Sequence, residues 1–221
     1  MESKSSKKEL DIGIGKEICI WQSEEECGDC DLNSTLFCRP KIKYLVYFAG
    51  PLFIGIIPTV LIVLFASVLL LFKLIFFISW LIYGLFFFNV WETRILCNHC
   101  PYFANESQKV LHCVIDKGKY KAGTYDPGPL SLSEKIQFGV GGILVMTFPI
   151  PFLLIWQLYF ALIFYIPSLL LWILVVQKKV CTDCINFACP LNKVPKDLMN
   201  KFMNRNPIIK EAWEKEGYSF E

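Results

Sequence analysis

The chain has 221 residues, of which 54% are hydrophobic, and its mean hydropathy of +0.45 exceeds that of an ordinary soluble domain. The formal net charge is only +2, so no excess of positive charge indicates a nucleic-acid partner. The chain also holds ten cysteines, all of which lie outside its long apolar runs.

Residues 1–43 combine a lysine-rich tail, expected to be mobile as far as about Glu9, with a cysteine-rich module. They contain no apolar segment typical of a secretory signal, so we expect no cleaved leader. The spacing of the module is C-x7-C-x2-C-x7-C, formed by Cys19, Cys27, Cys30 and Cys38. Four thiols in so short a segment suffice for one tetrahedral metal ion or one iron–sulfur cluster.

Two long apolar regions follow, at residues 44–91 and 132–176. A membrane-spanning helix needs roughly 20 apolar residues, so each region has room for two spans, the second with a tight turn near Trp156 and Gln157. We therefore predict an all-α integral membrane protein. Its four transmembrane helices would form two tandem hairpins in contact with the lipid bilayer.

Basic residues lie near the ends of both apolar regions: Arg39, Lys41, Lys43, Arg94, Lys135, Lys178 and Lys179. If each region is a hairpin, all these residues lie on one side of the membrane, and Lys73 near a hairpin turn is the exception. Lysine and arginine beside membrane spans mark the cytosolic side. The sequence thus predicts that both termini, the central loop and the cysteine-rich modules lie in the cytosol.

The central loop, residues 92–131, contains Cys97-x2-Cys100 and later Cys113. Alternating residues from Lys109 to Asp116 predict a short strand, with a turn at Gly118 and a return strand from Tyr120. At the end of the loop, Ser131-Leu-Ser-Glu134 has the pattern of a capping box that begins a helix.

The C-terminal segment, residues 177–221, contains Cys181-x2-Cys184-x4-Cys189. After it, apolar stripes predict two short amphipathic helices, the second beginning at Asn206-Pro207. These helices are expected either to cover the cysteine modules or to lie on the bilayer surface.

A weak tandem repeat relates the two halves of the chain. Residues Arg94–Ala104 and Lys178–Ala188 share the pattern basic, any, aliphatic, C-x2-C, two residues, Phe-Ala, and a similar basic segment precedes each hairpin. Two such units would be related by a pseudo-twofold axis along the membrane normal. We therefore predict one thiolate site shared by the two pairs, Cys97, Cys100, Cys181 and Cys184.

The predicted centre is zinc or an iron–sulfur cluster, since both bind four cysteines. Cys113 and Cys189 are candidate extra ligands, whereas His99 and His112 are expected to be solvated loop residues.

The resulting interpretation is a membrane-anchored metal–thiolate protein that transfers electrons or serves as a redox subunit, with a protein partner in the membrane or the cytosol. A zinc-stabilised scaffold or complex subunit without catalysis is the alternative. A membrane thiol–disulfide oxidoreductase is another, because Cys97-Asn-His-Cys100 resembles a thioredoxin-class pair. The sequence assigns no catalytic residue.

Overall fold

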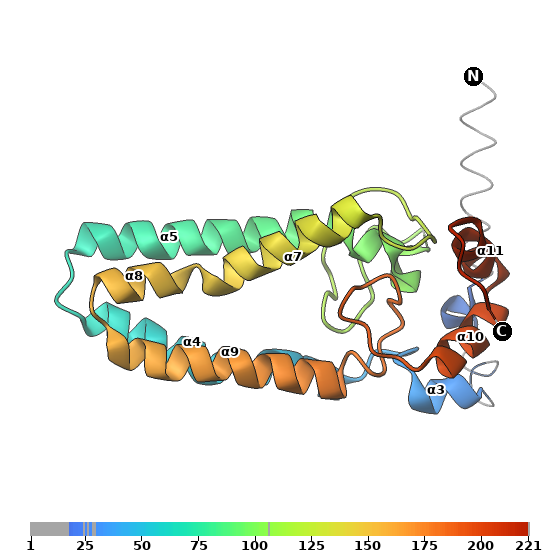
Figure 1. The fold of residues 1–221 in the computed structure, drawn as a ribbon, viewed down its shortest axis with the longest axis horizontal. Helices are drawn as coiled ribbons and strands as arrows, with labels where there is room; N and C mark the ends of the chain where they lie inside the picture. Colours follow the sequence, from blue (N-terminus) through green and yellow to red (C-terminus); the bar gives the residue numbers. More distant parts are fainter. Residues whose placement is uncertain (1–17, 24, 26, 28–29, 106, 221) are drawn as a thin grey trace, which may run out of the picture.

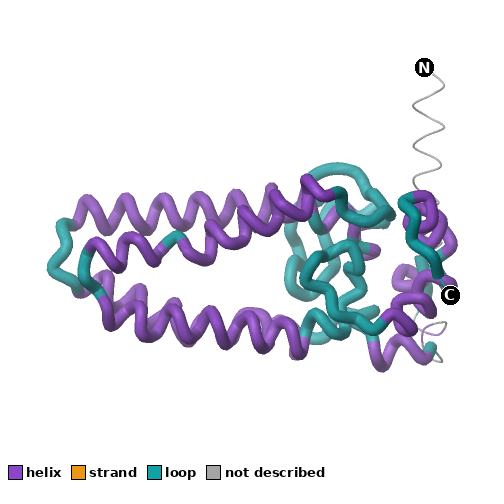
Figure 2. Tube along the Cα trace, in the orientation of Figure 1, coloured by secondary structure: helices purple, strands orange, loops and turns teal. Residues whose placement is uncertain are grey.

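The computed structural model describes residues 18–23, 25, 27, 30–105 and 107–220. The predicted N-terminal tail lies outside these residues. The described chain forms an elongated molecule, with long helices at one end and a domain of loops and short helices at the other (Figures 1 and 2). We call the second part the loop domain; it comprises residues 18–41, 96–131 and 180–220, without the masked positions.

The long helices come from the two apolar regions of the sequence. Within the described residues, four helical stretches are long and apolar enough to cross a membrane, which indicates a multi-pass membrane protein in contact with lipid. Their elements are α4 (Ile42–Phe65), α5 (Leu70–Phe86) with η2 (Phe87–Trp91) and α6 (Glu92–Ile95), α7 (Leu132–Thr147) with α8 (Pro149–Ile155), and α9 (Tyr159–Lys179). The prediction of four apolar helices is thus confirmed.

Both hairpins turn at the same end of the molecule, away from the loop domain (Figure 1). The first turn lies between Phe65 and Leu70, and Lys73 donates to the Leu64 carbonyl there. The second turn follows the predicted position: Gln157 has a positive φ of 56° between α8 and α9. The segments before α4, between the two hairpins and after α9 therefore all lie at the opposite end, in the loop domain.

The closest helix partners belong to different hairpins. Helix α4 packs along α9, and Thr59 donates to the carbonyl of Ala161 at 3.4 Å. The packing is tight at Gly55, where an added Cβ would come within 1.8 Å of Ser168 Oγ.

Helices α5 and α7 form the second pair, with Phe87 of η2 packed on Gly141. Trp80 and Tyr83 donate across this contact to the carbonyls of Val145 and Gly141, both at 3.3 Å. First-with-fourth and second-with-third pairing is compatible with a twofold relation between the two hairpins, although the contact of α4 with α9 is the more extensive one.

The start of α7 has the predicted capping box. The Ser131 hydroxyl accepts from the Glu134 backbone N–H at 3.3 Å, and Glu134 Oε2 accepts from the Ser131 N–H at 2.8 Å. These contacts satisfy backbone donors that the first helical turn leaves free. Pro149 then separates α7 from α8, because proline removes a backbone donor and crowds the preceding turn.

The loop domain is built from short helices: η1 (Cys19–Trp21), α3 (Asp31–Thr35), η3 (Cys97–His99), η4 (Pro101–Phe103), α10 (Lys196–Asn204) and α11 (Pro207–Lys215). Its core joins side chains distant in sequence, including Ile18, Leu36, Tyr102, Ile185 and Phe202. The amphipathic helices take part, because Met203 and Trp213 are buried in the same core. Of the two predicted placements, α10 and α11 therefore cover the cysteine-rich part of the molecule.

The predicted strands of the central loop are wrong, although their turn is present. Gly118 has a φ of 85°, and an isolated antiparallel bridge joins Val110 and Tyr120. The chain bends away after Leu111, so no strand extends through the described part of the loop. A lone two-stranded pairing without a third strand is only marginally stable.

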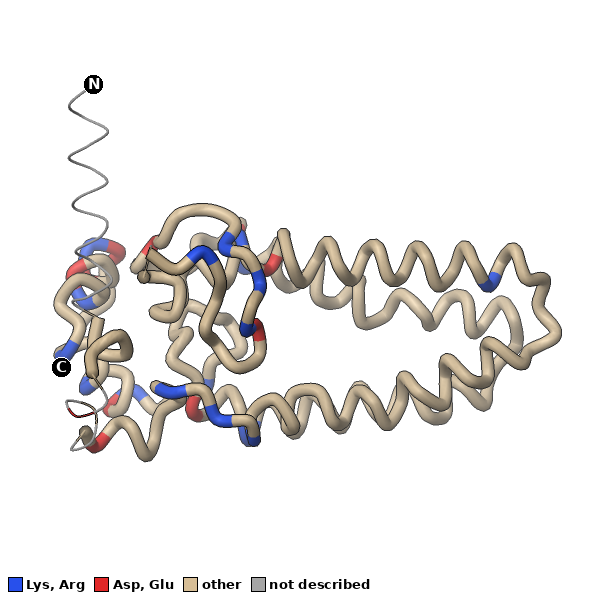
Figure 3. The backbone as a smooth tube through the Cα atoms, turned by 180° about the vertical axis from the view of Figure 1, so that it is seen from behind, with Lys and Arg blue, Asp and Glu red and all other residues tan. Residues whose placement is uncertain are grey.

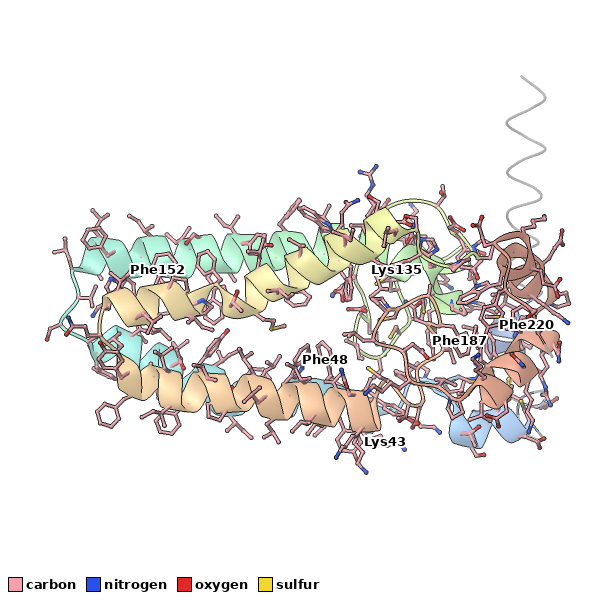
Figure 4. All side chains as sticks on the ribbon, in the orientation of Figure 1. Lys43, Phe48, Lys135, Phe152, Phe187 and Phe220 are labelled. Atoms are coloured by element: carbon pink, nitrogen blue, oxygen red, sulfur yellow. The ribbon has the colours of Figure 1, made fainter. Side chains whose placement is uncertain are left out.

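Charged residues gather at the loop-domain end of the molecule, whereas the helices carry almost none (Figure 3). Lys43 and Lys135 lie where the helices meet the loop domain, while Phe152 lies near the hairpin turns (Figure 4). Large apolar side chains such as Phe65 and Phe160 remain exposed along the helices, as lipid-facing residues would be.

Candidate metal centre

All ten cysteines are free thiols, and they belong to the loop domain or its junction with the helices. We divide them by position. The N-terminal cysteine group consists of Cys19, Cys27, Cys30 and Cys38. The central cysteine group consists of Cys97, Cys100, Cys113, Cys181, Cys184 and Cys189.

The N-terminal cysteine group brings its four thiols near one another. The pKa of Cys38 is raised to about 12, chiefly by burial and also by the neighbouring thiols of Cys19, Cys30 and Cys27. The pKa of Cys19 is also raised overall. Burial is the main cause and the neighbouring Cys30 and Cys27 add to it, whereas a hydrogen bond from Asn206 acts in the opposite direction. The symmetric spacing in the sequence therefore corresponds to proximity in space.

Three sulfur atoms of this group accept hydrogen bonds from side-chain N–H groups. The donors are Asn206 Nδ2 to Cys19 at 3.3 Å, Arg39 Nη2 to Cys27 at 3.4 Å and Arg205 Nη1 to Cys30 at 2.7 Å. Two of the three donors carry a full positive charge, which stabilises an anionic acceptor more than a neutral one. The Cys27 thiol also donates to the Cys19 carbonyl at 3.7 Å, so the group is held by hydrogen bonds in both directions.

Asn206 is the residue that joins this group to the C-terminal helices, and sequence reasoning missed that role. It occupies the predicted N-cap position of α11, yet its side chain does not cap the helix. Instead Oδ1 accepts from the Cys19 backbone N–H at 2.8 Å, and Nδ2 also donates to the Phe202 carbonyl at 2.7 Å. Only 1% of Asn206 is exposed, so these contacts are shielded from water.

In the central cysteine group, the two sequence repeats contact each other directly. The side chain of Asn186, in the second repeat, donates to the Leu96 carbonyl in the first at 3.1 Å. Equivalent positions of the repeats are also buried alike, as Cys97 with Cys181 and Ala104 with Ala188 show. The structure therefore brings both C-x2-C segments to the same end of the helices.

The central thiols ionise with difficulty. Burial raises the pKa of Cys113 and of Cys189 to about 12, and it raises that of Cys100 and Cys184 well above the usual range. Neighbouring thiols add to the effect: Cys113 and Cys184 act on Cys100, and Cys189 and Cys113 act on Cys184. Cys113, expected only as an additional ligand, therefore lies near a cysteine of each repeat, Cys100 and Cys184.

Neither histidine behaves as a solvated loop residue, so that expectation is wrong. His99 is only 5% exposed, and its Nδ1 donates to the Gly128 carbonyl at 2.9 Å. His112 packs edge-on against Trp21, and its Nε2 is buried without a hydrogen-bond partner. Sequence alone gave no sign of either environment, because both depend on segments distant along the chain.

A half-buried ion network that the sequence did not indicate lies beside Cys97. Lys119 Nζ contacts Asp116 Oδ1 at 2.5 Å and Glu92 Oε2 at 3.6 Å. Asp116 Oδ2 in turn accepts from the Cys97 thiol at 3.8 Å. This network ties η2 and α6 to the central loop, because Lys119 also donates to the Phe88 carbonyl.

The thiols do not enclose a common point. Throughout the described part of the chain, no three His, Cys, Asp or Glu side chains are arranged to hold a metal ion together. The shared site predicted at Cys97, Cys100, Cys181 and Cys184 therefore stays a prediction, as do the other predicted ligands.

Comparisons with known proteins identify no relative: no family model matches the chain, and neither the curated proteins nor the solved structures contain a match.

Proposed function

We propose that the chain is a multi-pass membrane protein that binds metal through the cysteines of its loop domain. The observation that carries this proposal is the set of N–H groups directed at Cys19, Cys27 and Cys30. Arginine and amide donors around clustered sulfur stabilise negative charge. Such donors are the outer contacts that orient and tune thiolate metal ligands.

The ionisation of the thiols favours metal binding over thiol–disulfide chemistry. Redox-active cysteines have a lowered pKa, because the thiolate is the attacking species. Burial instead raises the pKa of Cys100, Cys113, Cys184 and Cys189. A metal cation compensates the cost of burying several thiolates, and each thiol then loses its proton to solvent on binding.

The proposed site faces the cytosol. Basic residues flank the loop-domain ends of both apolar regions, and such residues mark the cytosolic side. That compartment keeps thiols reduced and available to metal, which agrees with ten free cysteines.

Metal would hold together a domain that has little regular backbone structure of its own. The N-terminal segment, the central loop and the C-terminal helices share one core, and short helices and turns connect them. With zinc the protein would act as a stabilised scaffold for a partner protein, whereas an iron–sulfur cluster would make it an electron carrier.

Metal analysis of the full-length protein, purified in detergent without oxygen, tests the proposal. We expect stoichiometric metal bound to the chain, and a chelator should release it while making the thiols reactive. Zinc without visible absorption supports the scaffold; iron and sulfide with visible absorption support the electron carrier. A chain without stoichiometric metal, whose ten thiols all titrate as free after unfolding, would overturn metal binding.

A further inference from the structure

The loop-domain ends of α4 and α9 adjoin each other and carry several basic residues. The two helices pack along each other, and Tyr44 in the first turn of α4 donates to Asp183 Oδ2, just beyond α9, at 2.8 Å. Tyr44 also shares a buried cluster with Val176 and Val180 at the end of α9. The basic residues of both helix ends therefore belong to one region of the surface (Figure 3). These residues are Arg39, Lys41, Lys43, Lys178 and Lys179.

Three of these cations have no acidic partner. Lys43, Lys178 and Lys179, which we call the basic patch, are exposed and take part in no ion pair with any described residue. Lys43 Nζ lies over the Tyr44 ring at 4.9 Å, which leaves its ammonium group without a counter-ion. The carboxylate of Asp183 at this end accepts hydrogen bonds from hydroxyl groups instead. The patch therefore keeps its positive charge available to an external anion.

The helix dipole accounts for only part of the basic patch. Cations are stabilised at a helix C-terminus, where Lys178 and Lys179 lie, but not in a first turn. Lys43 lies in the first turn of α4, which has neither an acidic residue nor a side-chain cap. The first turn of α7, by contrast, contains Glu134 in its capping box. An anion bound at the start of α4 would be stabilised both by Lys43 and by uncapped backbone N–H groups.

The corresponding end of the other helix pair carries less positive charge. Its helix ends have two exposed cations, Arg94 of α6 and Lys135 of α7. Glu134 directly precedes Lys135 in the chain and offsets part of their charge. The basic patch is therefore a feature of the α4 and α9 pair, and not of the whole boundary between the helices and the loop domain.

Apolar neighbours place the basic patch at the level of lipid headgroups. Val46 lies one turn after Lys43 on the same face of α4 and is 59% exposed. Leu174 lies one turn before Lys178 on the same face of α9 and is 57% exposed. In a bilayer these apolar side chains contact acyl chains, so the ammonium groups one turn further out lie at the phosphates. This position favours a lipid headgroup over a soluble acidic protein as the bound anion.

We propose that Lys43, Lys178 and Lys179, at the adjoining ends of α4 and α9, bind the headgroup of an anionic glycerophospholipid such as phosphatidylserine. The lipid phosphate accepts hydrogen bonds from the ammonium groups, and the acyl chains lie along the exposed apolar faces of the two helices. No cysteine takes part, so this binding is separate from the metal-binding function proposed above. Anionic lipids are concentrated in the cytosolic leaflet, which agrees with the proposed orientation.

Native mass spectrometry of the full-length protein in detergent tests this proposal, because it resolves individual bound lipids. Phosphatidylserine and phosphatidylcholine with the same acyl chains are added in equal amounts. We expect the first bound lipid to be phosphatidylserine with a preference of roughly fivefold or more, since one lysine near an anionic lipid contributes about that factor. Inorganic phosphate at constant ionic strength should not displace it. Equal binding of the two lipids, or displacement by phosphate, would overturn the proposal.

Charge-removing variants locate the site on one helix pair. Lys43→Gln combined with Lys178→Gln should abolish most of the preference for phosphatidylserine, whereas arginine at both positions should retain it. Arg94→Gln combined with Lys135→Gln is the matched control, because it removes the same amount of charge from the other helix pair. That variant should keep the preference of the unaltered chain. An equal loss in the two glutamine variants would overturn the assignment to α4 and α9.

Discussion

At the scale of single residues, Asn206 shows which structural features local sequence can predict and which it cannot. The Asn-Pro pair correctly predicts where α11 begins, because proline fits the first helical turn. The partner of the amide cannot be read from the same pair, since Cys19 lies 187 positions away. The position of a residue on its own helix is local information, whereas the contacts of its side chain are not.

Replacement of Asn206 by alanine should loosen the N-terminal cysteine group. The Cys19 N–H would then be buried without an acceptor, at a cost of about 1–3 kcal/mol. We expect backbone hydrogen exchange in residues 18–23 to rise roughly ten- to a hundredfold, as measured by mass spectrometry.

Asn204→Ala is the matched control, because Asn204 is exposed and its side chain accepts only a surface hydrogen bond from Lys210. That change should leave exchange in residues 18–23 unaltered. Equal exchange rates in the two variants would contradict the linking role of Asn206.

The cysteine positions were likewise evident in the sequence, but their surroundings were not. The spacing of the N-terminal module predicted a four-thiol site, and in the structure the other three thiols lie near enough to raise the pKa of Cys38. It gave no indication that Arg205 reaches Cys30, because that contact depends on how α10 packs. Nor did the C-x2-C pattern show that Cys113 lies near both repeats.

At the scale of helices, composition alone predicted the elements. Long apolar runs favour helices, the structure that satisfies every backbone group in lipid, so the four long apolar helices and the turn at Gln157 followed directly. Which helices pack together could not be predicted as readily. Helix α4 packs on α9 through small residues, and a hydropathy pattern does not distinguish such residues. The proposed twofold relation between the hairpins is the one sequence feature that bears on this pairing.

Gly55→Ala should weaken the contact between α4 and α9. The new Cβ would come within 1.8 Å of Ser168 Oγ and 2.5 Å of its Cβ, and overpacking of this kind costs about 1–3 kcal/mol. We expect a lower midpoint of thermal unfolding in detergent, and a partial recovery when Ser168→Gly is added.

Gly50→Ala on the same helix provides the comparison, because apart from the local backbone of α4 and the adjoining residues no atom lies within 4 Å of the added Cβ. That variant should unfold at or slightly above the temperature of the unaltered protein, since alanine favours helix more than glycine. A similar loss of stability at both glycines would show that α4 and α9 do not pack as described.

At the scale of the whole molecule, both hairpin turns lie at one end and the loop domain, to which the ten cysteines belong, lies at the other (Figure 1). This separation follows from an even number of spans in each apolar region. The charge distribution then gives the two ends different chemistry, because basic residues flank the helices almost only beside the loop domain.

Labelling with a membrane-impermeant maleimide tests the proposed orientation. In intact cells the unaltered chain should remain unlabelled, since all ten cysteines would face the cytosol. A single Ser67→Cys change at the exposed first hairpin turn should introduce one labelled site. Labelling of the unaltered chain without any gain from Ser67→Cys would reverse the orientation.

The bond between Cys19 and Asn206 also sets an order of assembly during synthesis. The first cysteines leave the ribosome early, but the amide that fixes Cys19 is added 187 residues later. At ordinary elongation rates that interval is roughly 10 to 40 seconds. Both hairpins are complete by then, so the earliest thiols to be made are among the last to be secured.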